Sequence, residues 1–77
     1  MSDYEERSRK KFIGELDKLI QEEESFMHHR EQLLIEAVKA DNYKGDYVTN
    51  LALSVREKFH MIKGLNQTKE RILNQKT

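Results

Sequence analysis

Two oppositely charged residues, Glu23 and Arg30, lie seven positions apart inside an otherwise apolar repeat. On a helix, residues at this spacing share one face. Both are equally far from the pair Phe26 and Met27, so two copies crossing antiparallel there would bring Glu23 of one copy to Arg30 of the other. Such a pair would fix the register and orientation of a dimer. The alternative is that both long side chains reach past the edge of an apolar core into solvent.

A second group with recognisable chemistry is basic and lies near both ends of the chain. Grouped cations of this kind contact phosphates or an acidic protein surface. Asp3, Glu5 and Glu6 lie close to them, and only Tyr4 is available for stacking, so solvated surface charge is the alternative. The formal net charge of the chain is +0, which gives no global field of the kind that marks an obligate DNA-binding protein. The residues of this basic group are Arg7, Arg9, Lys10, Lys11, Lys69, Arg71 and Lys76.

Histidines and carboxylates supply metal-ligand types but not the spacing of a metal site. His28 and His29 are neighbours, and adjacent helical residues point about 100° apart, so they cannot both reach one ion. No Gly-rich phosphate loop, Ser/His/Asp set or Cys nucleophile is present, and two helices enclose no pocket. We therefore expect no enzymatic activity, no metal, no cofactor and no small-molecule substrate.

The elements that must position these residues are helices, because apolar pairs recur every seven residues in the first half of the chain. No proline interrupts the pattern, and Gly14 costs only about 1 kcal/mol in a helix interior. The repeat predicts a first helix over residues 2–41. Its apolar pairs are Phe12 and Ile13, Leu19 and Ile20, Phe26 and Met27, and Leu33 and Leu34, and Leu16 and Ala37 belong to the remaining line of the same face.

A break follows at residues 41–46, where turn-forming residues gather, and Asp46 is placed to cap a second helix over residues 46–75. A turn at 42–45 is short enough to force the helices antiparallel. The chain is thus predicted to be a single all-α helical-hairpin domain over 1–77, with a basic open end where the first ten or so residues overhang. The residues expected to pack are Phe12, Leu16, Leu19, Phe26, Leu33, Val48, Leu51, Val55, Phe59, Ile62, Leu65 and Ile72, with Lys69 as the one charge in the second helix's seam.

Two helices bury only one stripe against each other, and several apolar residues remain without a place: Ile35, Val38, Tyr47, Leu53 and Met61. We therefore expect a protein partner. It is either a second copy, giving a four-helix bundle, or a client protein that accepts the second face. No run approaches the roughly 18 apolar residues of a membrane span, and no basic-then-apolar leader opens the chain, so a cytoplasmic location without membrane contact is expected.

The proline-free hairpin, the acidic segment 12–25, the basic segment 47–77 and the Lys/Asn/Gln-rich stretch from Lys63 to Lys76 together resemble small helical accessory proteins of tailed bacteriophages. That group includes the kind encoded beside the UvsW recombination helicase. The resemblance implies an accessory role near recombination or replication machinery in the host cytoplasm. Two functions are therefore predicted. One is a protein-interaction or assembly module, and the other is a helicase-associated accessory protein whose basic end contacts nucleic acid.

Overall fold

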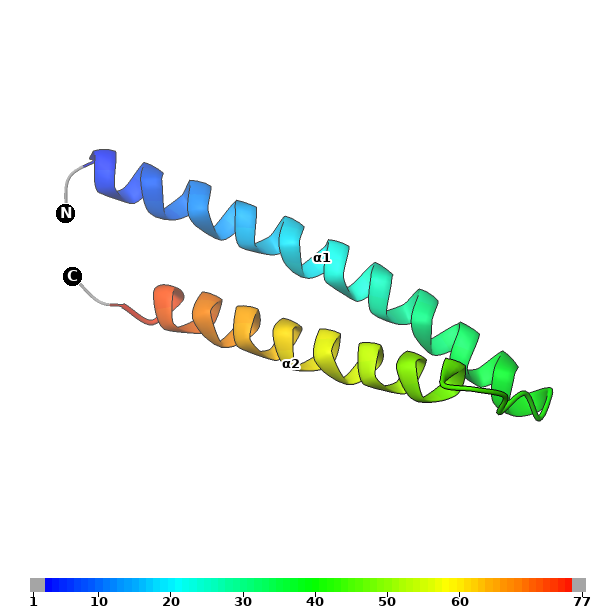
Figure 1. Cartoon of the computed structure of the whole chain (residues 1–77). Coiled ribbons are helices and arrows are strands. Elements are labelled where there is room, and N and C mark those ends of the chain that lie inside the picture. Colours follow the sequence, from blue (N-terminus) through cyan, green and yellow to red (C-terminus); the bar gives the residue numbers. More distant parts are fainter. Residues whose placement is uncertain (1–2, 76–77) are drawn as a thin grey trace.

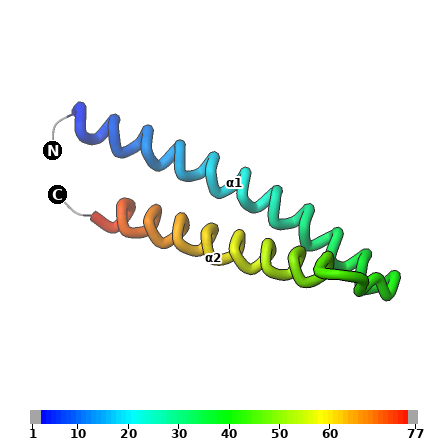
Figure 2. Tube along the Cα trace, viewed as in Figure 1, coloured from blue at the N-terminus to red at the C-terminus, as the bar shows by residue number. Residues whose placement is uncertain are grey.

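The computed structural model describes residues 3–75, which form two helices joined by one turn. Helix α1 spans Asp3–Lys39 and helix α2 spans Tyr47–Leu73. They run side by side in opposite directions, so that the start of α1 and the end of α2 lie at the same end of the molecule (Figure 1). The Cα trace in Figure 2 follows the same rod, which measures 58 × 15 × 15 Å. The all-α antiparallel hairpin predicted from the sequence is confirmed.

The turn begins with a Schellman motif that ends α1. Asp41 adopts a left-handed conformation with φ of 51°. The Asn42 N–H donates to the Ala37 carbonyl at 2.9 Å, and the Asp41 N–H donates to the Val38 carbonyl at 3.1 Å. These two bonds satisfy carbonyls that the end of the helix leaves free. Helix α1 therefore ends at Lys39, two residues before the predicted boundary.

The second half of the turn leads into α2 through Gly45, whose φ of 61° lies in the region that glycine tolerates best. Asp46 occupies the N-cap position as predicted, but its side chain makes no capping hydrogen bond. Its carbonyl accepts the Asn50 N–H at 2.8 Å. The predicted start of the first helix, at residue 2, lies outside the described residues.

The helices meet along a seam in which buried and half-buried residues alternate at three-and-four spacing on both sides. In each apolar pair of α1 the second residue lies in the seam, and the first lies on its flank. On α2, Lys58 lies in the seam, whereas Phe59, which was expected to pack there, is 55% exposed. The seam consists of Ile13, Leu16, Ile20, Glu23, Met27, Arg30, Leu34 and Ala37 on α1, and of Val48, Leu51, Val55, Lys58, Ile62, Leu65, Lys69 and Ile72 on α2.

Only a narrow apolar core results from this arrangement. Among residues 3–75, the buried apolar side chains are Leu16, Ile20, Ala37, Leu51 and Ile62. None of the large side chains in that range is completely enclosed. Every other apolar side chain in that range is at least partly exposed to solvent.

Candidate interaction surface

Two ion pairs join α1 to α2 across the seam. Lys69 Nζ lies 2.6 Å from Asp17 Oδ1, and Lys58 Nζ lies 2.6 Å from Glu23 Oε2. The side chains of the second pair are 24% and 22% exposed, against 31% and 45% for the first. The Glu23 pair is therefore the less exposed of the two, and we expect its charges to couple more strongly because less water screens them.

A polar layer surrounds the Glu23 pair at the middle of the seam. The Lys58 ammonium also lies 4.7 Å from the centre of the Phe26 ring, and the Arg30 guanidinium lies at the same distance from that ring. Both contacts are cation–π interactions. Arg30 Nε is buried without a hydrogen-bond partner, and Glu23 Oε2 has the Lys58 ion pair but no hydrogen bond of regular geometry. Glu23 and Arg30 thus lie in the seam as predicted, and Glu23 has its partner within the chain. A pairing of the two between copies stays a prediction.

On one flank of the seam, the first residues of the α1 apolar pairs form a line of their own. Leu19 is 46% exposed and Phe26 is 40% exposed, with Phe12 before them and Leu33 after them at the same spacing. A helix that packs in a bundle has a third apolar position in each heptad, beside the two positions that form the seam. This third position contacts a further helix of the bundle, other than the one packed along the seam. In this structure Phe12, Leu19 and Phe26 are exposed at that position, and Leu33 is half-buried.

Helix α2 contributes a matching line to the same flank. Phe12 and Gln75 line one groove, so the line that begins at Phe12 runs beside the line that reaches Gln75 in seven-residue steps. That α2 line contains Tyr47, Ser54, Met61 and Thr68, so Tyr47 and Met61 are its apolar members. The Thr68 hydroxyl donates to the Gly64 carbonyl at 2.9 Å, so its hydrogen-bonding need is met inside the helix. We call this flank the apolar face and define it by Phe12, Leu19, Phe26 and Leu33 of α1 with Tyr47 and Met61 of α2.

The opposite flank has a different character. On α1 it carries the acidic line Asp17, Glu24 and Glu31. On α2 it carries Phe59, whose ring packs edge-on against the neighbouring His60 ring with centroids 5.9 Å apart. The charged line interrupts any continuous apolar surface on this side, so the hairpin is apolar on one flank and acidic on part of the other.

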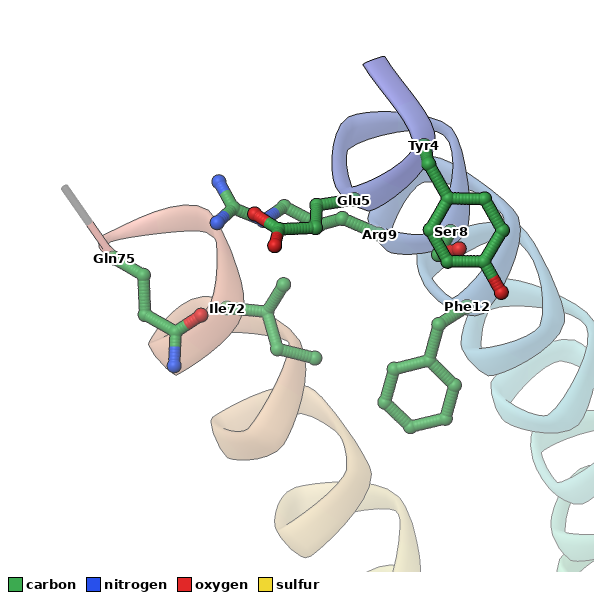
Figure 3. Close-up of a pocket in the computed structure, with 7 residues that line it drawn as sticks. All are labelled: Tyr4, Glu5, Ser8, Arg9, Phe12, Ile72 and Gln75. Carbon is green, nitrogen blue, oxygen red and sulfur yellow. The ribbon is translucent and has the colours of Figure 1, made fainter. Parts of the chain in front are cut away.

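At the open end, the apolar face continues into a shallow groove of about 370 Å³. Figure 3 shows Phe12 and Ile72 approaching each other across the two helices, with the Tyr4 ring above Phe12 and the Gln75 amide beyond Ile72. Ile72 therefore lies level with residues near 12, and the overhang of α1 begins there. The groove is wide open to solvent and offers the geometry of a contact surface.

The predicted basic residues lie on and beside this overhang, with the exception of Lys76, which is outside the described residues. Arg7 Nε donates to the Asp3 carbonyl at 3.4 Å, and Lys69 is held by Asp17. Arg9 is half-buried, whereas Lys10, Lys11 and Arg71 are exposed. The cations thus gather near one end of the hairpin, where a backbone carbonyl engages Arg7 and the Asp17 carboxylate engages Lys69.

The histidines are placed as surface residues. His28 is exposed, as its position in the repeat predicted, and its Nδ1 lies 3.6 Å from Glu31 Oε1. Over residues 3–75, no three His, Cys, Asp or Glu side chains gather closely enough to hold a metal ion. Within the same range, neither helix has the length and apolarity of a membrane span.

Lys58 is the residue of this region that the hydrophobic pattern missed, because Phe59 is the more apolar neighbour. The strict three-and-four spacing from Leu51 through Val55 to Ile62 passes through position 58, and that spacing is the signal that identifies it. Comparison of the chain with protein-family models, with curated proteins and with solved structures found no match.

Proposed function

We propose that this chain is a protein-interaction and assembly module that binds its partner through the apolar face. The function requires no catalytic chemistry and no cofactor. The proposal places the chain in the cytoplasm, and in the cytoplasm of the host cell if its resemblance to phage accessory proteins reflects its origin.

The observation that carries the proposal is the apolar face, whose α1 line is apolar at every seven-residue step from Phe12 to Leu33 and is joined by Tyr47 and Met61 of α2. Leu19 and Met61 are each 46% exposed, on different helices of the same flank. Contiguous exposed apolar surface of this kind is rare on monomeric proteins and marks sites of association. The narrow core points the same way, because covering the face would bury side chains that the hairpin alone leaves in water.

The test compares two substitutions of similar exposure on opposite flanks. Leu19→Glu places a charge on the apolar face, and Phe59→Glu places one on the other flank. We expect Leu19→Glu to abolish association with any partner, including a second copy, while Phe59→Glu leaves it intact at both low and high salt. Equal loss in both variants, with helicity retained, would remove the apolar face from the function.

A second candidate function is contact with nucleic acid through the open end. It is supported by the overhang of α1 past α2, which leaves Arg7, Lys10 and Lys11 on a single exposed helix. Phosphate contacts of this kind make affinity fall steeply with salt. Fluorescence anisotropy with single-stranded and duplex DNA, between about 50 and 200 mM salt, distinguishes the candidates. Binding that weakens about tenfold or more over this range, and that is lost when residues 1–11 are removed, supports the nucleic-acid role.

A further inference from the structure

We infer that the apolar face is covered by a second copy of the chain, with the turns of both hairpins at the same end, so that α1 of each copy packs against α2 of the other. This inference rests on the proposed function and names its partner. The arrangement is a four-helix bundle whose twofold axis runs parallel to the helices.

The exposed area of the hairpin supports a second copy as the occupant. A globular monomer of 9.2 kDa exposes about 4,900 Å² of surface. This chain exposes 6231 Å², an excess of about 1,300 Å². A protein interface of standard size buries about 800 Å² on each partner, which would remove more than half of that excess. Two hairpins laid face to face would reduce their combined surface from about 12,500 to about 10,900 Å², toward the roughly 8,200 Å² of a globular protein of twice the mass.

The charges beside the apolar face determine the orientation. Rotation about a twofold axis parallel to the helices does not shift any residue along the length of the bundle. Helix α1 therefore meets the other copy's α2 with the same residues side by side as within one chain, where Asp17 lies beside Lys69. In that register Glu15 lies level with Arg71. Glu15 borders the apolar face between Phe12 and Leu19, and Arg71 borders the polar end of the α2 line between Thr68 and Gln75. The acid of one copy would therefore meet the base of the other.

The next positions along the same borders agree with this orientation. His29 lies level with Glu57, Glu36 with Asn50, and Glu22 with a glycine. No two like charges are opposed at these heights. The charges along the proposed interface thus follow the same segregation as the whole chain, in which the first helix is acidic and the second is basic.

The alternative orientation inverts one hairpin, so that the turns lie at opposite ends and α1 crosses its own copy at Phe26. In that arrangement Glu15 of one copy lies almost opposite Glu36 of the other copy, with an offset of one residue along the helix. With the crossing at Phe26, these like charges at the border of the interface oppose association. The hairpin therefore has a charge pattern that favours one of two otherwise similar bundles.

The first experiment measures mass by analytical ultracentrifugation over a wide concentration range. We expect two-chain mass for the unaltered protein and for Phe59→Glu, and one-chain mass for Leu19→Glu, with circular dichroism confirming that every variant remains helical. One-chain mass for the unaltered protein at about 100 μM, roughly a hundredfold above a Kd of about 1 μM, overturns the inference. If that monomer binds a different protein in a Leu19-dependent way, the proposed interaction function survives without the second copy.

The second experiment measures orientation and uses the absence of cysteine from the chain. A spin label on Lys44→Cys marks the turn. With helices spaced about 10 Å apart, the two labels of a same-end dimer lie within about 30 Å. Opposite ends would separate them by roughly the 58 Å length of the hairpin and would refute the orientation. A label on Ser25→Cys, near mid-height, gives a short distance in either dimer and serves as the control.

Charge reversal provides an independent check on the orientation. Glu15→Lys should weaken the dimer about fivefold or more, and adding Arg71→Glu should restore it, because the pair is then reversed rather than broken. A double variant no tighter than Glu15→Lys alone would contradict the proposed contact between α1 and the other copy's α2.

Discussion

The two ion pairs of the seam have equal Nζ–O distances of 2.6 Å and unequal burial, which makes them a matched test of how environment sets the strength of a charge pair. We expect the half-buried Glu23–Lys58 pair to contribute a coupling free energy of about 1 kcal/mol, and the more exposed Asp17–Lys69 pair about 0.3 kcal/mol. Double-mutant cycles with Glu23→Gln and Lys58→Met, and with Asp17→Asn and Lys69→Met, measure these couplings. Urea unfolding followed by circular dichroism, at fixed protein concentration, supplies each free energy of unfolding.

Salt separates the pairs further, because mobile ions reach an exposed pair more easily than a half-buried one. Raising ionic strength from about 0.01 to 1 M shortens the Debye length from about 30 to about 3 Å. We expect this change to eliminate the Asp17–Lys69 coupling and to leave about half or more of the Glu23–Lys58 coupling. Equal couplings in low salt, or a larger value for Asp17–Lys69, would show that burial is not what strengthens the central pair.

The other predictions concern the free energy of unfolding, measured by the same method at one protein concentration. Leu16→Ala should cost about 3 kcal/mol, because this side chain is only 3% exposed, and a cost below about 1 kcal/mol would contradict the packed seam. Gly14→Ala should stabilise the chain by about 1 kcal/mol, since a Cβ at that helical position meets nothing within 4 Å. Gly45→Ala should destabilise it by about 1 kcal/mol, since its φ of +61° strains any residue with a Cβ, and the opposite signs of the two glycine substitutions are the check. Asp41→Gly should stabilise the chain by about 0.5 kcal/mol by relieving its left-handed conformation at φ of 51°, seen as a rise in thermal midpoint of roughly 2–4 °C.

Much of the fold could be predicted because its signals are local. The seven-residue apolar repeat requires helices, and the turn residues at 41–46 interrupt it only once, so a hairpin is the only short connection available. The predicted limits of α1 and α2 differ from the observed ones by one or two residues where the structure describes them. The end of α1 shifted because Asp41 adopts the left-handed conformation, a choice made by the backbone of the turn.

The rotation of each helix about its axis could not be predicted from hydrophobicity. Adjacent residues of a helix point about 100° apart, so Phe26 and Met27 are equally apolar candidates for a single seam position. Packing against α2 places Met27 in the seam and leaves Phe26 on the apolar face. The same choice on α2 selects Lys58 over Phe59, and the cost of a half-buried ammonium is offset by an acid that lies 35 positions away in the sequence, Glu23.

The sequence by itself determined that the chain is helical, that it folds back once, and that its acidic and basic segments lie side by side, because each of these depends on residue spacing along the chain. The tertiary structure decided which apolar residues are buried, which ions pair, and which flank stays uncovered. Those outcomes depend on the rotation and register of two helices, which are set by the sum of all contacts along the seam and by no single stretch of sequence.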